Sequence, residues 1–455
     1  MGTGILDPAA MVGPGGNAAL AQVRRAGATF ARLKLDWPAV APGGATKPSA
    51  FDARDPGDPS YSWSSIDDPV RRTVAKGLTP IIYIESAPRW AQEGRSMRPI
   101  DGPTKPSPAA LADFTTALAK RYSGDYRGLP RVRYWQVWNE PNLSVFLMPQ
   151  VDGTDVVSAS WYRGMVNAAA EALHAVHRDN VVIAGALAPF GGIVRGPDTD
   201  RHQERIAPLR FMREMLCMSK GVRPKPTCDQ TSQFDVWSHH PYTNGSPTHS
   251  AVNPDDVSLG DLDEMRRLLR AARQAGRIES RGDVSFWVTE FSYDSQPGDP
   301  RGLPPALHAR WVSEALYRMW SDGVTLVTWF LLRDQPFPSA FFQSGLYTID
   351  GKPKPALRAF RFPFVVFAQP GGKLAYWGRT PPGLRKVVLV EQKQGGRWRT
   401  AARLRTDRHG IFSGAISSAA KNGFLRVRIV GGEASLPFSL TVPKDFRFCP
   451  FGSGC

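Results

Sequence analysis

The sequence predicts a (β/α)8 TIM barrel followed by a small C-terminal antiparallel β-sandwich, and three observations lead to this fold class. The chain has 455 residues, which suits one large domain and one small domain. Short apolar runs alternate with amphipathic segments up to about residue 360, and short β-rich segments follow. We therefore expect residues 1–362 to form the barrel and residues 363–455 to form an immunoglobulin-like sandwich.

The apolar runs of the first part are short, rich in β-branched and aromatic residues, and continuous rather than alternating with polar residues. This pattern is typical of parallel strands that are buried on both faces. The eight runs are Gly4–Leu6, Thr29–Leu35, Thr79–Ile84, Val132–Trp138, Val181–Leu187, Phe234–Ser238, Phe286–Thr289 and Val324–Phe330. Eight parallel strands can close on themselves, which removes both edges of the sheet. The alternative is a doubly wound open sheet.

Segments with apolar residues at helical spacing lie between these runs. Ser107 and Pro108 form a good cap and first turn for a helix that continues through Arg121. The other expected helices are Ser64–Lys76, Ser158–His177, Ile206–Lys220, Asp261–Ala275 and Pro305–Asp322. This alternation of strand and helix is what a parallel barrel requires.

The C-terminal part reads differently because its apolar segments are short and are separated by Gly, Pro or Ser. Such spacing predicts an antiparallel sandwich. The expected strands are Tyr376–Trp377, Lys386–Glu391, Trp398–Leu404, Gly410–Ser413, Leu425–Val430 and Phe438–Val442.

Composition excludes two classes of protein. Apolar residues make up 42% of the chain and charged residues 22%, which argues against disorder. No uninterrupted apolar stretch reaches the roughly 18 to 20 residues that a membrane-spanning helix needs. We therefore expect no membrane span.

The positive charge is concentrated in the C-terminal part. The whole chain has a net charge of +16, and residues 363–455 contain 15 basic and 4 acidic residues. One interpretation is a solvated arginine-rich surface, and the other is attraction to an acidic polysaccharide or cell wall. We expect no nucleic-acid partner, because zinc-finger spacing, an RNP-like aromatic strand and a basic heptad pattern are all missing from the sequence.

The four cysteines form two close pairs, Cys217 with Cys228 and Cys449 with Cys455. Neither pair has C-x-x-C spacing, so two local disulfides in an oxidising compartment are the simplest interpretation. Residues 1–16 lack a signal-peptide pattern, which fits a cytosolic protein or a chain whose signal peptide has been removed. The cysteine pairs favour the second alternative, so we expect a secreted protein.

Reactive side chains follow the apolar runs. Asp36 and Trp37 come after the second run, Glu85 after the third, Asn139 and Glu140 after the fourth, His239, His240 and Tyr242 after the sixth, Glu290 after the seventh, and Arg333 and Asp334 after the eighth. The carboxyl ends of the strands of a parallel barrel meet at one face, where such barrels carry their chemistry. We expect a catalytic site at this face.

Two glutamates are the strongest candidates for catalysis. Glu140 lies in a Trp-rich segment, where burial would raise its pKa and keep it protonated near neutral pH. Glu290 ends the seventh predicted strand, which lies three strands further round the barrel than the fourth. The two carboxyl groups would therefore face each other across the barrel mouth. Arg32 lies inside a doubly buried strand and must find an anion. Arg32 and Tyr242 would keep Glu290 ionised.

These segments resemble the clan A retaining glycoside hydrolases, most closely family 39 and less closely family 5. The resemblance covers about residues 4–365 and depends mainly on Trp-Asn-Glu-Pro at residues 138–141 and Thr-Glu at residues 289–290. Supporting motifs are Ser238–Tyr242, Ala87–Ala91, Gly345–Tyr347 and Asp350–Ala356.

The resemblance implies a role for each matching residue. Glu140 would be the acid/base and Glu290 the nucleophile. Asn139 would bind the sugar 2-hydroxyl, Arg32 would lie near the nucleophile and Tyr242 would donate to it. His240 would contact the substrate or orient Glu140, and Trp329 would form the aromatic floor under the cleaved sugar.

Other residues have two interpretations. Glu85 and Asp36 either bind sugar hydroxyls or pair with Arg32, Lys34 or Arg89. Trp37 is a sugar platform or packs beneath its own loop. His239 and His240 are adjacent on a strand, so their side chains point to opposite faces and suit one metal poorly. We expect no metal and no organic cofactor.

The sequence therefore predicts a secreted, monomeric, retaining O-glycosidase that acts on a plant or bacterial oligosaccharide, polysaccharide or glycoside. Two alternatives remain open. One is a transglycosidase that uses the same residues, and the other is a non-catalytic basic protein that binds glycans or cell walls.

Overall fold

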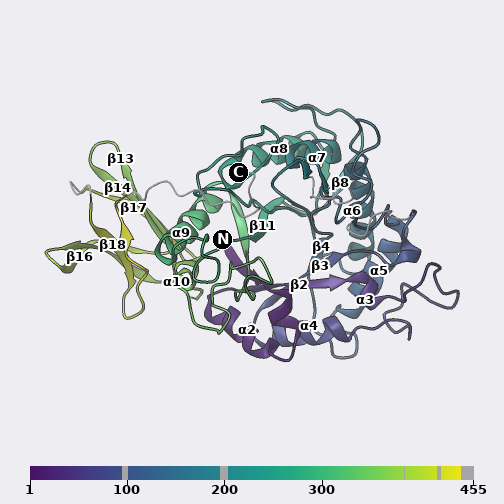
Figure 1. The fold of residues 1–455 in the computed structure, drawn as a ribbon, viewed down its shortest axis with the longest axis horizontal. Coiled ribbons are helices and arrows are strands. Elements are labelled where there is room, and N and C mark those ends of the chain that lie inside the picture. Colours follow the sequence, from purple (N-terminus) through teal and green to yellow (C-terminus); the bar gives the residue numbers. More distant parts are fainter. Residues whose placement is uncertain (95–100, 195–202, 384, 418–421, 442–455) are drawn as a thin grey trace.

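The computed structural model describes residues 1–94, 101–194, 203–383, 385–417 and 422–441. Its main feature is a closed barrel of eight parallel strands with helices around it (Figure 1). The barrel strands are β1 (Gly2–Leu6), β2 (Phe30–Asp36), β3 (Thr79–Glu85), β4 (Tyr134–Val137), β5 (Val181–Leu187), β9 (Val236–His239), β11 (Ser285–Phe291) and β12 (Val324–Phe330). The predicted barrel is confirmed, and the open-sheet alternative is wrong.

Each barrel strand pairs in parallel with its neighbour in chain order, and β12 closes the ring by pairing with β1. The turns that lead from helices back into strands contain glycines with positive φ. Gly77 and Gly323 have φ values of 66° and 82°, a left-handed conformation that glycine adopts at little cost. These turns lie at the end of the barrel opposite the reactive side chains.

The six helices that the sequence predicts are all present. They are α4 (Ser64–Ala75), α5 (Pro108–Arg121), α6 (Val157–Val176), α7 (Pro208–Leu216), α8 (Leu262–Gln274) and α9 (Pro305–Ser321). Within the described residues, four further α-helices accompany them: α1 (Pro8–Val12), α2 (Gly16–Arg25), α3 (Trp37–Val40) and α10 (Pro355–Arg361).

Helix α7 ends four residues before the predicted end at Lys220. Cys217 caps it in the left-handed conformation, with φ 52°, and is joined to Cys228 by a disulfide. The crosslink therefore coincides with the helix end. The second predicted pair, Cys449 and Cys455, lies outside the described residues.

The interior of the barrel changes from apolar to polar toward its carboxyl face. A closed apolar cluster fills the lower part and contains Ile81, Ile183, Val236, Trp287 and Leu326. Alternate residues of a strand point to the same side. Arg32 of β2 and Tyr83 of β3 lie two residues beyond the level of this cluster, so their side chains also point into the barrel. A polar layer therefore lies directly beneath the mouth of the barrel.

The C-terminal part forms two antiparallel sheets. The first has the order β13 (Phe364–Gln369), β14 (Lys373–Arg379) and β17 (Ile411–Ser417). The second has the order β16 (Arg397–Arg405), β15 (Val387–Gln394), β18 (Phe424–Ile429) and β19 (Phe438–Ser439). The sequence analysis did not assign β13, whose continuous apolar run directly follows α10. We still propose residues 363–455 as the second domain.

The first C-terminal sheet packs on helix α9 (Figure 1). Trp377 is 1% exposed, and its ring lies 5.6 Å from that of Tyr317 and 5.4 Å from that of Trp320. Arg379 is buried and donates to the Thr3 hydroxyl in β1 and to the Phe360 carbonyl in α10. The sheet is therefore joined to the barrel through an aromatic contact and a buried cation.

Among the described residues, none of the helices combines the length and the hydropathy needed to cross a membrane.

We expect the substitution Trp377→Ala to lower the free energy of unfolding by about 3–5 kcal/mol, because it leaves a cavity in a closed aromatic contact. Val222→Ala is the control, since Val222 is 91% exposed and should change the stability by less than about 0.5 kcal/mol. Urea unfolding of both variants measures the difference. Equal stabilities would contradict the proposed packing of the sheet on the barrel.

Candidate active site

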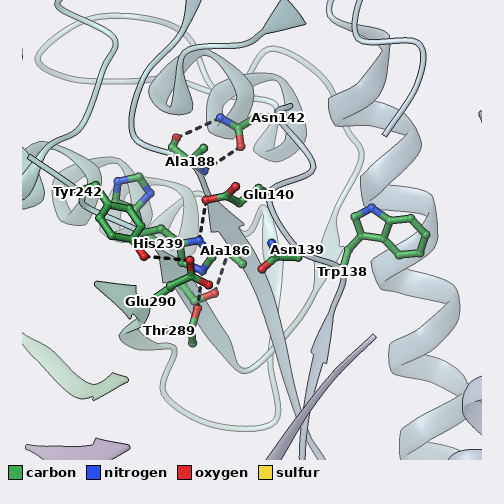
Figure 2. A network of polar contacts seen from close by, with 12 residues as sticks. Trp138, Asn139, Glu140, Asn142, Ala186, Ala188, His239, Tyr242, Thr289 and Glu290 are labelled. Carbon is green, nitrogen blue, oxygen red and sulfur yellow. Dashed lines mark hydrogen bonds and ion pairs between the residues drawn. The ribbon is translucent and has the colours of Figure 1, made fainter. Parts of the chain in front are cut away.

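Two carboxyl groups meet at the carboxyl face of the barrel. Glu140 follows β4 and Glu290 lies near the end of β11, and their side chains point toward one another (Figure 2). Polar atoms of Glu140, His240 and Glu290 all lie within 4.8 Å of one another. Residues 150 positions apart in the sequence thus form one cluster, as the strand ends predict.

Arg32 organises this cluster from below. Its Nη1 lies 2.9 Å from Oε2 of Glu290, its Nη2 donates to Oδ1 of Asn139 at 2.7 Å, and its Nε donates to Oε1 of Gln136 at 3.1 Å. The guanidinium stacks on the ring of Tyr83, 3.9 Å from the ring centre. The side chain is 0% exposed. The buried cation therefore has the anion that the sequence requires.

Glu290 has a second donor on its other oxygen. The hydroxyl of Tyr242 donates to Oε1 at 2.9 Å, and burial together with the nearby carboxylates raises the pKa of Tyr242 well above its ordinary value. The tyrosine stays protonated and keeps donating. A cation and a hydroxyl therefore both stabilise the ionised form of Glu290.

Glu140 has a different environment, although its side chain is also only 14% exposed. Burial raises its pKa to about 7, and the positive charges of Arg32 and Arg205 only partly oppose this rise. Its Oε1 lies 2.9 Å from Nδ1 of His240. Burial also lowers the pKa of His240 to about 3, so the imidazole is neutral and provides a hydrogen bond without a charge.

The neutral His240 is held between two elements. Its Nε2 lies 3.2 Å from the hydroxyl of Thr289 on β11, and its Nδ1 faces Glu140. His239 turns the other way, and its Nε2 contacts the carbonyl of Val257. The opposite directions of these two histidines agree with the prediction from the strand geometry.

The segment that carries Glu140 is strained. Trp138 and Glu140 have φ values of 72° and 40°, a left-handed region that costs most residues energy. The carbonyl of Ala186 accepts a hydrogen bond from the backbone of Glu140. The indole of Trp138 points away from the carboxyl groups (Figure 2) and donates to the carbonyl of Phe146. It therefore anchors the loop and does not shield Glu140.

Asn142 holds the same segment in place from the other side. Its amide donates to the carbonyls of Ala188 and Ile206, and its carbonyl accepts from the backbone of Ala188 (Figure 2). Asn142 is 0% exposed. These three bonds connect the loop after β4 to the loops after β5, which fixes the position of Glu140.

Both glutamates open into one cavity of about 170 Å³. Its wall combines acidic, basic and aromatic side chains from the loops after β4, β5 and β9, from β11 and the loop after it, and from residues 341–342. They are Glu140, Leu143, Ala188, Pro189, Phe190, Arg205, Tyr242, Glu290, Ser292, Asp294, Phe341 and Phe342. Burial raises the pKa of Asp294 to about 7, so this cavity contains a second carboxyl that titrates near neutral pH.

A further cavity of about 380 Å³ lies beside Glu85, between the loops after β3 and β4. Glu85 accepts a hydrogen bond from Lys34 at 2.8 Å, so the pairing that the sequence left open is with Lys34. Burial is the main cause that raises the pKa of the neighbouring Asp36, and the charge of Glu85 adds to it. Polar side chains therefore extend from the glutamate pair toward this cavity.

Two residues predicted to bind sugar do not reach the cavities. Trp37 is 0% exposed and stacks on Phe114 of α5 at 5.0 Å, because α3 begins at this residue and turns it under the loop. Trp329 is 1% exposed and packs against His308 and Phe360. Both predictions are wrong for this structure.

Strand alternation explains the position of Trp329. Leu326 of β12 points into the barrel, so Thr328 and Phe330 also point inward and Trp329 points outward. Phe330 is half-buried and its ring contacts that of Phe342 at 5.1 Å. The aromatic side chain at this strand end is therefore Phe330, which counting from Leu326 could have predicted.

Sequence reasoning missed several residues of the site. Gln136 could have been found, because a polar residue inside an apolar strand run needs a partner. Asn142 and Asp294 lie on loops and Arg205 ends the short strand β7 (Gln203–Arg205). The sequence alone gives no signal that these particular side chains turn toward the barrel mouth.

Glu140, His240 and Glu290 also have the donor types of a metal site. However, the carboxylate of Glu290 is paired with Arg32 at 2.9 Å and bonded to Tyr242. A fixed guanidinium this close would repel a divalent cation. The donor set therefore fits an ion pair with an adjacent carboxylic acid better than a metal.

Comparisons with known proteins agree on the fold. No protein-family model and no curated protein matches the chain. A family 39 glycoside hydrolase from the gut symbiont Bacteroides cellulosilyticus WH2 has a similar structure, with a TM-score of 0.53 and 17% identity over 91% of this chain and 79% of that chain. The GH39 enzyme from Xanthomonas axonopodis pv. citri aligns with a TM-score of 0.52 and 15% identity over 91% of both chains. The structural resemblance to family 39 that the motifs predict is confirmed.

Replacing each of the two glutamates with glutamine should have opposite effects on the stability of the protein. The pKa of Glu140 is raised from 4.5 to about 7, so the folded state binds its proton more tightly than the unfolded state. The contribution of the Glu140 carboxyl to the free energy of unfolding therefore falls as the pH rises from about 4.5 to 7. We expect Glu140→Gln to be more stable than the wild type at pH 8 by about 3 kcal/mol, and about equal at pH 4.

Glu290→Gln removes the anion from the buried Arg32 and should lower the stability at pH 8 by roughly 3 kcal/mol. Guanidinium unfolding of both variants at the two pH values measures these effects. A destabilised Glu140→Gln variant at pH 8 would show that Glu140 is held as an anion, contrary to its environment in the structure.

Proposed function

We propose that this protein is a retaining O-glycosidase in which Glu290 is the nucleophile and Glu140 is the acid/base. One observation carries the proposal. A carboxylate fixed by Arg32 and Tyr242 lies within 4.8 Å of a carboxyl whose pKa is raised to about 7, and both open into the same cavity. The family 39 fold supports the same activity.

The first step follows from the different charges of the two glutamates. The anionic Glu290 attacks the anomeric carbon of a bound glycoside and forms a glycosyl ester. Glu140 donates its proton to the departing oxygen, so the leaving group departs as a neutral alcohol.

The second step follows from the loss of one charge. Once Glu290 is an ester, it no longer neutralises Arg32, and the field of the guanidinium favours the anionic form of Glu140. Glu140 then accepts a proton from water as that water attacks the anomeric carbon. The sugar is released with its original configuration, and both carboxyl groups return to their starting states.

The separation of the carboxyl groups favours retention over inversion. Retaining enzymes hold their carboxyl groups about 5–5.5 Å apart, whereas inverting enzymes leave about 6.5–9.5 Å for a water molecule. Oxygens of Glu140 and Glu290 lie within 4.8 Å. This gap is too small for an inverting water between them.

Neighbouring residues suit a sugar ring. The carbonyl oxygen of Asn139 is occupied by Arg32, so its amide group is oriented to donate to the sugar 2-hydroxyl. Phe330 and Phe342 provide apolar faces at the strand end, which can pack against the apolar face of a sugar. His240 orients Glu140 through the bond at Nδ1.

The partner in this proposal is a carbohydrate of plant or bacterial origin, and we propose that the protein acts outside the cell as a monomer. The disulfide between Cys217 and Cys228 supports an oxidising compartment. Transglycosylation would use the same residues with a sugar hydroxyl in place of water, and product analysis with an added acceptor separates the two reactions.

Leaving-group dependence tests the two roles separately. We expect Glu140→Gln to lower the turnover of alkyl glycosides by about 10²–10⁴-fold, and to affect glycosylation by dinitrophenyl glycosides much less because this leaving group needs no proton. Glu290→Gln should abolish turnover of both substrates, by about 10⁴-fold or more. Burst and steady-state kinetics on a panel of sugars measure both effects. The assignment fails if Glu290→Gln keeps near-native activity.

The pH dependence should report the acid. We expect kcat/KM to fall above an apparent pKa of about 7, since Glu140 must be protonated in the free enzyme. Asp294→Asn is the matched control, because burial raises the pKa of this carboxyl in the same cavity to about 7 as well. The alkaline limb should persist in Asp294→Asn and vanish in Glu140→Gln. The reverse result would assign the acid role to Asp294.

A further inference from the structure

The basic residues of the C-terminal part are concentrated on one sheet. Of the 15 basic residues among residues 363–455, seven lie on strands β15, β16 and β18 of the four-stranded sheet. They are Lys393, Arg397, Arg399, Arg403, Arg405, Arg426 and Arg428. These three strands contain a single acidic residue, Glu391. The three-stranded sheet carries much less charge, and its Arg379 is buried against the barrel.

The strand register divides these cations between the two faces of the sheet. Leu389 pairs with Arg403 on one side and with Arg428 on the other, and paired residues point to the same face. Arg405 lies two residues beyond Arg403 and therefore points the same way. Glu391 pairs with Arg426, which adds that residue to the same face.

A bulge in β16 changes which residues of its first half point to each face of the sheet. The register shifts between Val390 and Glu391, so that Lys393 pairs with Trp398, and both belong to the face of Glu391. Arg397 and Arg399 pair with Gln394 and Gln392 and point to the opposite face. We call the first set the basic face, which consists of Lys393, Trp398, Arg403, Arg405, Arg426 and Arg428 with Glu391.

The basic face is turned to solvent. The opposite face of the sheet contributes buried apolar residues such as Val388, Val390 and Val427 to the core. Figure 1 shows β16 at the end of the molecule farthest from the barrel. Arg403 and Arg405 are exposed, and within the part of the chain that the structure describes no acidic side chain pairs with them.

Glu391 organises the centre of the basic face instead of neutralising it. Its two oxygens accept bonds from Arg426 at 2.8 Å and from Arg428 at 3.0 and 2.8 Å. Arg426 is also stacked over the ring of Trp398 at 4.3 Å. One carboxylate faces five cations, so the face keeps a strong positive charge while two of its arginines are held in fixed positions.

We propose that the basic face binds a carboxylated polysaccharide. Arginine forks match carboxylates in a two-bonded geometry. Arg403 and Arg405 are about 7 Å apart along one strand, and Arg403 and Arg428 are about 10 Å apart across the sheet. A flat array with these spacings can contact successive carboxylates of a linear polymer. The choice of a carbohydrate among polyanions rests on the proposed function.

A nucleic acid fits this face less well. Binding of single strands relies on several aromatic side chains that stack bases. On this face Arg426 covers the ring of Trp398, and strand alternation adds the ring of Phe424, which lies two residues before Arg426 on β18. Readout of a duplex needs an element that enters a groove, whereas this face is a flat sheet. Duplex DNA is therefore the competing ligand in the test.

The experiment uses the full chain with Glu290→Gln, so that no polymer is cleaved. Binding to polygalacturonate, neutral dextran and duplex DNA is measured by titration calorimetry at several salt concentrations. We expect binding to polygalacturonate that weakens with salt, and no binding to dextran. Arg403→Ser with Arg405→Ser should weaken this binding at least about tenfold, since two charge-assisted contacts are lost.

The matched control is Arg397→Ser with Arg399→Ser, which removes the same charge from the same strand on the opposite face. It should change the affinity less than about threefold, because only the long-range field is altered. Thermal unfolding of both double variants verifies that they fold.

Three results would overturn the proposal: no binding of polygalacturonate, equal losses in the two double variants, or tighter binding of duplex DNA. Hydrolysis of small aryl glycosides by the chain with native Glu290 is measured in parallel. If no hydrolysis is found, the proposed function is refuted but the binding proposal is not, because the comparison of the two double variants does not depend on catalysis.

Discussion

The candidate site depends on one buried cation. Arg32 is fully enclosed beneath the barrel mouth, and among its hydrogen bonds to described residues the one anionic partner is the carboxylate of Glu290. A desolvated guanidinium without an anion would destabilise the fold by several kcal/mol, so the fold itself requires Glu290 to be ionised. Gln136 and Asn139 accept from Nε and Nη2 of Arg32, but their side-chain amides carry no charge and cannot neutralise it. The charge of the proposed nucleophile is therefore a consequence of folding.

Glu140 shows what the same surroundings do to a carboxyl without such a partner. It lies in the same cavity, but its close neighbour is a neutral His240, and burial therefore favours its protonated form. The strained backbone at Trp138 and Glu140 is held by Asn142 and by the bond to Ala186. Energy stored in this segment is the cost of directing Glu140 toward Glu290. Two chemically identical side chains thus acquire different charges from their positions alone.

The sequence predicted the barrel and the glutamate pair because both follow from strand patterns. Continuous apolar runs identify buried parallel strands, and parallel strands end at one face, so Glu140, Glu290, Arg32 and Tyr242 could be brought together without a structure. The predictions that were wrong concern the direction in which side chains point at the strand ends. Trp37 and Trp329 have the right composition and place in the sequence, but a helix start and the alternation of β12 turn them away. Asn142 and Asp294 lie on loops, whose course no periodic pattern records.

A side-chain NMR titration tests the central claim most directly. The chain has twelve glutamates, so selective ¹³C labelling of their carboxyl carbons gives few resonances. The account predicts one resonance with a midpoint near pH 7 that is missing from Glu140→Gln. A resonance near pH 7 that disappears with Glu290 instead of Glu140 would contradict the account.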